Sequence, residues 1–74
     1  LSAGEGSCIA YNAADEVAVS AFEAGRVRYT DIATIVAGAL ERGWPSRAAD
    51  LDSIFEIDGR AREYAETGVR EIEC

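Results

Sequence analysis

The chain has 74 residues, of which 49% are hydrophobic and 28% are charged, and this balance fits a globular protein and argues against intrinsic disorder. Fourteen acidic residues stand against seven arginines, with no lysine or histidine, which argues against nucleic acid or an anionic membrane surface as a partner, because both bind basic faces. No apolar run approaches the roughly 20 residues of a membrane span.

The first predicted helix covers about residues 8–24. Apolar side chains recur at three- and four-residue spacing from Ala10 to Phe22, and this spacing places one stripe along a helix. Most of these residues are alanine, so a neighbouring helix can approach closely but gains little buried area. Ser7 is the expected N-cap, and Gly25 is the expected left-handed residue that ends the helix.

The second predicted helix covers about residues 31–42. Thr30 is the expected N-cap, and Asp31 places a negative charge in the first turn, where it meets the positive end of the helix dipole. The apolar stripe of this helix carries larger side chains than the first, so we expect it to hold much of the core. Gly43 ends the helix and Pro45 prevents it from resuming, while the tryptophan between them is expected to cover the end of the bundle.

The last part of the chain predicts a short helix over 50–56 and a main helix over 59–72. Asp58 is the expected cap of the last helix, with Ile57 as a hydrophobic staple before it. Gly68 lies inside the last helix, where glycine costs about 1 kcal/mol relative to alanine. Two interpretations stay open for this glycine, a close helix crossing and a tolerated weak position.

The pattern as a whole predicts an all-α fold, because no strand-like alternation competes with the helical spacing. We expect residues 1–74 to form a single domain, a small bundle of three main helices and one short helix. The large side chains expected in the core are Phe22, Tyr29, Ile32, Ile35, Val36, Leu40, Trp44, Leu51, Ile54, Phe55, Ile57, Tyr64, Val69 and Ile72. This core is thin, and a chain of this length buries only about 60% of its unfolded surface, so we expect marginal stability without a partner.

Two cysteines, Cys8 and Cys74, lie near the two ends. Their density is below that of secreted disulfide-rich domains, so we expect reduced thiols and a cytoplasmic location. Structural zinc usually takes four cysteine or histidine ligands. With two thiols and no histidine, no metal site is assigned.

Polar residues of the first helix are the first candidates for chemistry. Carboxylates can serve in acid–base catalysis or bind metals. Asp15 and Glu16 are neighbours, however, and lie about 100° apart around a helix. Asn12 and Glu16 share one face at four-residue spacing, so a scaffold hydrogen bond is the favoured interpretation. We assign no catalytic or cofactor-binding residue.

Four arginines form the second set of candidates: Arg26, Arg28, Arg60 and Arg62. Guanidinium groups can bind phosphate or carboxylate groups bidentately. Ion pairs with acidic residues of adjacent helices are the favoured interpretation, because acidic residues outnumber basic ones two to one.

One alternative function comes from the run Asp52-Ser53-Ile54 at a helix start. It resembles the Asp-Ser-Leu motif on which acyl carrier proteins receive phosphopantetheine, and the small size and acidity also fit. The alternative is therefore an autonomous acidic interaction module with Ser53 as its attachment site. The predicted break in the helix at Asp58 and Gly59 does not fit the carrier pattern.

Two blocks of the sequence resemble the C-terminal helical domain of the 1-deoxy-D-xylulose 5-phosphate reductoisomerase family. The first block is Asn12-Ala13-Ala14-Asp15-Glu16, followed by Ala21-Phe22, Ala24-Gly25-Arg26 and Arg28-Tyr29-Thr30-Asp31-Ile32. The second is Asp50-Leu51-Asp52-Ser53-Ile54, followed by Asp58-Gly59-Arg60-Ala61-Arg62-Glu63. The residues that carry the signature are Asn12, Asp15, Glu16, Gly25, Thr30, Asp31, Asp58 and Arg62. Asp15 stands where the family usually has asparagine, and Tyr29 where phenylalanine is common.

The resemblance implies a parent enzyme of the non-mevalonate isoprenoid pathway that rearranges its substrate and reduces it with NADPH, using magnesium or manganese. The nucleotide- and metal-binding domains of that family lie upstream, so the resemblance implies no cofactor and no activity in this chain alone. It implies a structural domain that braces the catalytic domain of the parent chain. We further expect a four-helix bundle without its first helix, which would leave an apolar groove and a tendency to self-associate.

Overall fold

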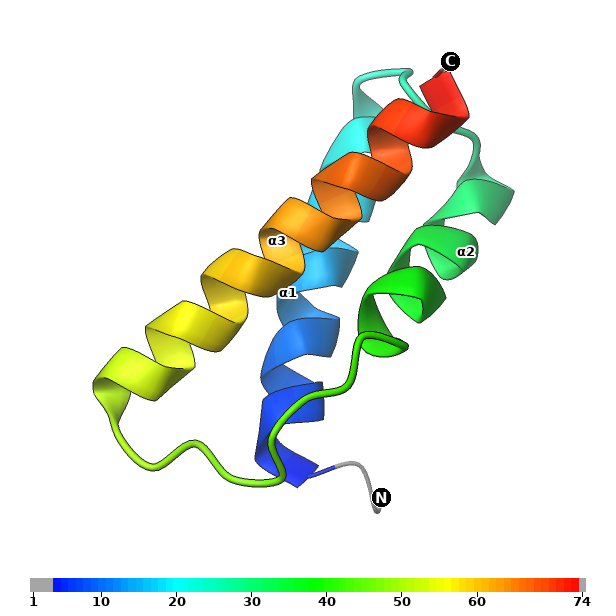
Figure 1. Ribbon diagram of the computed structural model, residues 1–74. Coiled ribbons are helices and arrows are strands. Elements are labelled where there is room, and N and C mark those ends of the chain that lie inside the picture. The colour runs from blue at the N-terminus through cyan, green and yellow to red at the C-terminus, as the bar shows by residue number, and fades with distance from the viewer. Residues whose placement is uncertain (1–3, 74) are drawn as a thin grey trace.

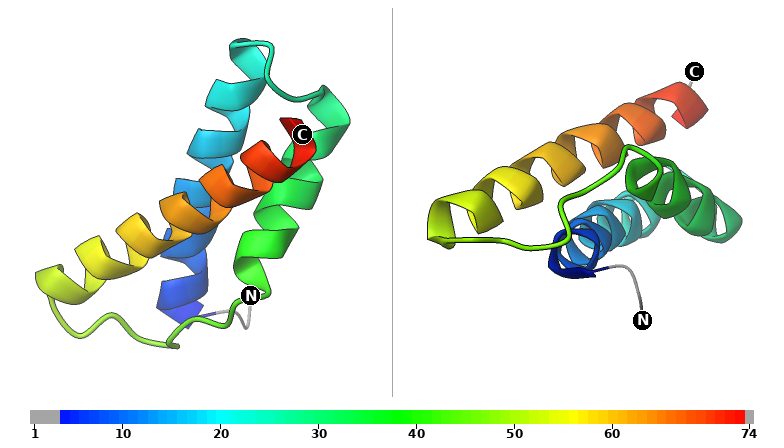
Figure 2. Two further views of the ribbon diagram at one scale, coloured as in Figure 1. Left: turned by 45° about the horizontal axis from the view of Figure 1, so that its top comes forward. Right: turned by 60° about the horizontal axis from the view of Figure 1, so that its bottom comes forward.

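The computed structural model describes residues 4–73 and contains three helices (Figure 1). They are α1 (Gly4–Glu23), α2 (Tyr29–Leu40) and α3 (Leu51–Glu73). α1 and α2 run antiparallel, and α3 lies across both of them (Figure 2). No strand occurs among the described residues, so the predicted all-α bundle is confirmed. None of the three helices has both the length and the apolar character needed to cross a membrane.

α1 begins at Gly4, earlier than the predicted start near residue 8. The backbone N–H groups of Glu5 and Gly6 donate hydrogen bonds of 3.0 Å to the carbonyl oxygens of Ser46 and Pro45. These loop carbonyls satisfy the free N–H groups of the helix start, so a side-chain cap at Ser7 is not needed. A Cβ atom on Gly6 would lie 2.1 Å from the Pro45 oxygen, so this close approach requires glycine.

The turn between α1 and α2 contains the predicted glycine stop. Gly25 has φ +80°, the left-handed conformation that favours glycine. α2 then begins at Tyr29, and the residue before the helix is Arg28 rather than the predicted cap Thr30. The reason is that the Asp31 carboxylate accepts a 2.8 Å hydrogen bond from the Arg28 backbone N–H. This contact moves the helix start two residues toward the N-terminus.

The end of α2 is closed by a tryptophan. Gly43 follows the helix with φ +83°, as the predicted stop requires. The indole N–H of Trp44 donates a 3.0 Å hydrogen bond to the carbonyl oxygen of Ala39. Its ring meets that of Tyr64 on α3 edge to face, with 5.8 Å between the ring centroids. The aromatic pair therefore joins the end of α2 to α3.

α3 is one continuous helix, whereas the sequence predicts two helices over 50–56 and 59–72. Asp58 does not cap a new helix; its carboxylate accepts a 2.8 Å hydrogen bond from Arg62 one turn further on. Ile57 is buried, so the helix keeps its register there in order to pack this side chain. The cost of Gly59, about 1 kcal/mol, does not break the helix.

Most buried residues of the core are alanines, although four of the predicted large side chains, Ile35, Val36, Ile57 and Val69, are buried among them. The buried apolar residues are Ala10, Ala13, Ala14, Ala18, Ala21, Val27, Ile35, Val36, Ala39, Ile57, Ala61, Ala65 and Val69. Five of the predicted core residues are instead exposed: Phe22, Tyr29, Leu51, Ile54 and Phe55. Close alanine-lined crossings leave no room for large side chains between the helices, so these five lie on outer faces.

Gly68 illustrates how closely the helices approach. A Cβ atom there would lie 3.7 Å from the side chain of Ile35 on α2, which is ordinary van der Waals contact. α2 and α3 therefore do meet at this glycine, but alanine would also fit. Of the two interpretations that the sequence leaves open, a helix contact is present and the requirement for glycine is not.

Candidate functional site

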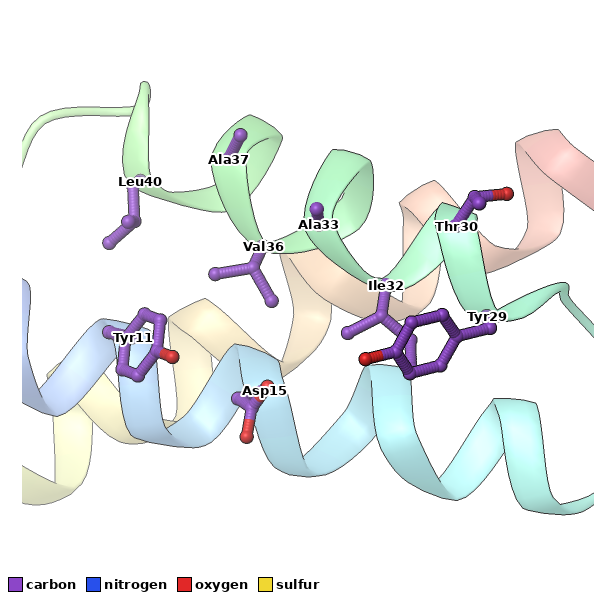
Figure 3. Close-up of a pocket in the computed structure, with 9 residues that line it drawn as sticks. All are labelled: Tyr11, Asp15, Tyr29, Thr30, Ile32, Ala33, Val36, Ala37 and Leu40. Carbon is purple, nitrogen blue, oxygen red and sulfur yellow. The ribbon is translucent and has the colours of Figure 1, made fainter.

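An open groove of about 580 Å³ runs between α1 and α2 (Figure 3). We call it the α1–α2 groove. It is lined by Tyr11, Asp15, Tyr29, Thr30, Ile32, Ala33, Val36, Ala37 and Leu40. Seven of the nine come from α2, because that helix presents one whole side to the groove.

The lining of the α1–α2 groove is apolar with aromatic ends. Figure 3 shows aliphatic side chains of α2 pointing toward α1, with the rings of Tyr11 and Tyr29 far apart along the groove. Tyr29 is 74% exposed, and its ring packs edge-on against Phe22 with 5.8 Å between centroids. Asp15 is the one carboxylate in the lining. Such a surface suits apolar side chains of a protein partner.

The groove does not suit a metal or a phosphorylated cofactor. No arginine lines it, so nothing there would neutralise phosphate groups. Within residues 4–73, no group of three or more His, Cys, Asp or Glu side chains could hold a metal ion.

Three of the predicted signature residues meet at one point between α1 and α3. Arg62 donates to the carboxylate of Asp58 at 2.8 Å and lies 2.6 Å from a carboxylate oxygen of Glu16. The hydrogen bonds that Arg62 donates to these two carboxylates, Asp58 first and then Glu16, raise the pKa of Arg62. The arrangement links α1 to α3. Both carboxylates belong to the fold, so the Arg62 guanidinium already has ion-pair partners within the chain.

The polar residues Asn12, Asp15 and Glu16 line one open hollow on the surface of α1, which Glu23 also borders. Asp15 is half-buried and also lines the α1–α2 groove, whereas Asn12 and Glu16 are exposed. No hydrogen bond of the Asn12 side chain is found in the part of the chain that the structure describes. Its predicted scaffold bond stays a prediction.

The remaining signature residues shape the turn from α1 to α2. Gly25 gives the left-handed turn, Asp31 caps α2, and Thr30 lines the groove beside them. All three residues therefore lie at or near the turn that joins the two helices of the groove.

Arg26 ties this turn to the end of α3. Its guanidinium donates to Glu73 at 2.9 Å and 3.0 Å and to Glu66 at 3.0 Å. The hydrogen bond from Arg26 lowers the pKa of Glu73, and the two carboxylates in turn raise the pKa of Arg26. The predicted pairing of an arginine with acidic residues of another helix is met here and at Arg62.

Two predicted pairings differ from this pattern, because Arg28 and Arg60 pair with residues close in sequence. Arg28 lies 3.9 Å from Asp31, and Arg60 lies 3.9 Å from Glu56. Neither arginine joins two helices, so both contribute to the local surface rather than to the packing of the bundle.

The sequence reasoning missed Tyr11, which lies half-exposed at one end of the groove. It also assigned Tyr29 to the core. The available signal was an excess of large side chains over what alanine-rich helices can enclose. Such an excess indicates an uncovered apolar surface, although it does not locate it.

Ser53, the attachment site of the alternative function, lies half-buried in the first turn of α3. Its backbone N–H donates a 2.8 Å hydrogen bond to the carboxylate of Asp50. This bond lowers the pKa of Asp50 and makes that residue the cap of α3. Cys74, the second predicted thiol, lies outside the described residues, and Cys8 is exposed.

Comparison with known proteins gives one consistent result. A family model described as "DXP reductoisomerase C-terminal domain" matches residues 1–64. The chain is 46% identical over 70 residues to the 1-deoxy-D-xylulose 5-phosphate reductoisomerase of Bordetella pertussis, which covers 88% of this chain and 17% of the relative. It is 41% identical over 71 residues to that of Haemophilus influenzae strain 86-028NP, covering 96% of this chain and 18% of the relative.

A third relative, from Cupriavidus taiwanensis and of the same name, is 54% identical over 59 residues, covering 78% of this chain and 15% of the relative. The chain thus spans less than a fifth of the length of the curated relatives it matches. No solved structure matches the chain.

Proposed function

This chain belongs to the 1-deoxy-D-xylulose 5-phosphate reductoisomerase family, in which it corresponds to the C-terminal domain, and from that premise we propose that it braces the catalytic part of a parent enzyme without catalysing the reaction itself. The parent is then a cytoplasmic, NADPH-dependent enzyme of the non-mevalonate isoprenoid pathway that uses magnesium or manganese. On this proposal, both cofactors are held by other domains of the parent chain.

The α1–α2 groove is the observation that supports this role. Its aliphatic lining extends along most of α2, and neither this lining nor the tyrosines Tyr11 and Tyr29 at its ends are covered by another helix within residues 4–73. Covering apolar surface stabilises a protein by about 25 cal/mol per Å². We therefore assign the groove to an apolar segment of the parent chain, which would rest between α1 and α2.

The length of the relatives supports the same assignment. More than four-fifths of each relative lies outside the matched region. A covering segment can therefore come from the same polypeptide. The two surfaces are then held near each other by the chain, so their contact avoids the entropy cost of bringing two separate molecules together.

The test is a charged substitution in the groove, made in the full-length parent chain. Ala33 is exposed and lines the groove, so Ala33→Arg would place a long charged side chain where the covering segment rests. We expect a lower thermal midpoint of the full-length enzyme and faster loss of activity on heating. The KM for NADPH measured well below the midpoint should stay unchanged.

The matched control is Thr34→Arg, because Thr34 is an exposed neighbour on α2 that does not line the groove. It should leave the midpoint near that of the unmodified enzyme. In the 74-residue chain by itself, at concentrations low enough to keep it monomeric, both variants should unfold like the parent sequence, since the groove is open there. Equal midpoints for the two full-length variants would show that the groove is not covered.

The carrier-protein alternative has its own test. Co-expression with a phosphopantetheinyl transferase, followed by intact mass measurement, would reveal a prosthetic group on Ser53. We expect no mass increase, because the relatives named above are reductoisomerases.

A further inference from the structure

The first turns of α3 carry a second apolar surface, distinct from the α1–α2 groove. Leu51 is 63% exposed and Phe55 is 64% exposed, while Ile54 between them is 36% exposed. Figures 1 and 2 show that this end of α3 diverges from α1 and α2 and is joined to them by the loop after α2. We call Leu51, Ile54 and Phe55 the α3 overhang.

The apolar surface continues from the α3 overhang to the start of α1. A shallow hollow of about 700 Å³ lies beside Ile54, and its lining includes Cys8 and Ile9 of α1 and Ala48 of the loop. Glu5 and Arg47 also line it, and the Glu5 carboxylate accepts a 2.8 Å hydrogen bond from the Ala48 backbone N–H. An apolar side chain entering the hollow would therefore meet apolar atoms from three segments.

The rim of the α3 overhang is acidic. Residues 46–58 contain four carboxylates, Asp50, Asp52, Glu56 and Asp58, and one arginine, Arg47. Of these, Asp58 pairs with Arg62 at 2.8 Å and Glu56 pairs with Arg60 at 3.9 Å, so the negative charge that faces a partner comes mainly from Asp50 and Asp52. For Asp52, which immediately follows Leu51, the described residues supply no ion-pair partner. The surface thus combines an apolar centre with net negative charge at its edge.

This charge distribution decides what can cover the surface. A second copy of the chain would bring two acidic rims together, and like charges facing each other oppose association. A segment with apolar side chains at its centre and lysine or arginine at its edges would match both features. The parent chain has the required length outside this domain.

We propose that the α3 overhang is a second docking surface, which binds an apolar, basic-edged segment of the parent chain from outside residues 1–74. The inference rests on the proposed function, since it requires that the domain pack against the rest of the chain. It adds a second contact at the opposite end of α2 from Tyr29. At this contact, the acidic rim favours a partner segment that carries lysine or arginine.

The test is photo-cross-linking in the full-length chain. p-Benzoylphenylalanine replaces Phe55, a conservative change at an exposed aromatic position, and a second protein carries it at Tyr29 in the α1–α2 groove. After irradiation, peptide mass spectrometry identifies the cross-linked segment. We expect position 55 to join a segment outside residues 1–74 that carries lysine or arginine within a few residues of the cross-link.

The electrostatic part of the proposal is tested by changing the salt concentration and by substitutions that remove charge. Raising the salt concentration should lower the cross-link yield at position 55 and leave the yield at position 29 unchanged, because salt screens exposed charges. The pair Asp52→Asn and Glu56→Gln should reproduce the loss at low salt. Circular dichroism checks that each variant keeps its helices.

The outcomes separate the two proposals. A cross-link at position 29 with none at position 55 overturns the overhang proposal and leaves the bracing function intact. A cross-link from position 55 to residues 1–74 of a second copy, or a yield at position 55 that does not depend on salt, also overturns it. Failure at both positions overturns the bracing function.

Discussion

Two helical glycines show how differently single residues act in this fold. Gly59 lies in α3 with no atom within 4 Å of an added Cβ, whereas a Cβ on Gly6 would lie 2.1 Å from the Pro45 carbonyl oxygen. That oxygen also accepts the 3.0 Å hydrogen bond from the Gly6 backbone N–H. The same substitution should therefore have opposite effects at the two positions.

We predict that Gly59→Ala raises the free energy of unfolding by about 1 kcal/mol, because alanine loses less conformational freedom in a helix. Gly6→Ala should lower it by about 1–3 kcal/mol, since the loop over residues 45–48 must move to admit the methyl group. Urea denaturation followed by circular dichroism measures both changes. A stabilising Gly6→Ala would mean that the loop does not close against the start of α1.

The ion pair of Arg26 and Glu73 should make the stability of the fold depend on pH. Arg26 lowers the pKa of the Glu73 carboxyl, so the folded state binds a proton less readily than the unfolded state does. A carboxyl group of this kind contributes stability above its unfolded pKa, near 4.3. The contribution is lost as the pH falls through the lower folded value.

Arg26→Gln should therefore lower the thermal midpoint at pH 7, and the difference from the unmodified chain should vanish as the solution is acidified below the folded pKa of Glu73. The effect should be small and should shrink in high salt, because the pair is exposed. Thermal scans at a series of pH values from 7 downward, with and without salt, measure it. A difference that stays constant throughout the acid range would assign the effect of Arg26 to packing instead.

At the scale of helices, the sequence was sufficient for the number of main elements and for two of their ends. The glycines at 25 and 43 both adopt the left-handed conformation expected of them. The starts of α1 and α2 were misplaced because the caps come from elsewhere: loop carbonyls at α1, and a side chain reaching back from Asp31 at α2. The contacts at α1 come from residues distant in sequence, which local cap preferences cannot identify. The contact at α2 is local, and there the sequence reasoning chose the Thr30 side chain as the cap instead of the Asp31 carboxylate.

The separation of α3 into two helices failed for a related reason. Asp58 followed by glycine is a typical helix start, and locally it predicts one. In the fold, Asp58 binds Arg62, which also reaches Glu16 on α1. The tertiary contact and the burial of Ile57 outweigh the local preference.

The crossing of α1 and α3 depends on small side chains. Ala61 is fully buried and packs in one cluster with Ala10 and Ala13 of α1 and with Ile57. We predict that Ala61→Leu lowers the free energy of unfolding by about 1–3 kcal/mol, because the helices must separate to admit the larger side chain.

Ala33→Leu is the control for this substitution, since Ala33 is exposed in the open groove. It should change the stability of the 74-residue chain by less than about 0.5 kcal/mol. Urea denaturation of both variants gives the comparison. Equal changes in the free energy of unfolding at the two positions would contradict the view that alanine side chains allow α1 and α3 to pack closely.

At the scale of the whole molecule, the alanine core explains why the candidate surfaces were not predicted. Periodicity assigned fourteen large side chains to the inside of the bundle, and it could not show that five of them lie outside because the helices meet through alanines. Tyr29, Leu51 and Phe55, each more than 60% exposed, are the result. The scaffold role of the signature residues stays a prediction, which rests on the absence of histidine from the sequence.

The exposed surfaces lead to a last prediction, about the 74-residue chain in isolation. With the α1–α2 groove uncovered, two copies can bury their apolar floors against each other, while a formal net charge of −7 per chain opposes the contact. We therefore expect reversible self-association that rises with protein concentration and with salt, because salt screens the repulsion. Sedimentation equilibrium at low and high salt measures it, and Ala33→Arg should weaken it while Thr34→Arg should not. A chain that stays monomeric and stable at high concentration and high salt would show that the open groove needs no cover, and this result would count against the bracing function as well.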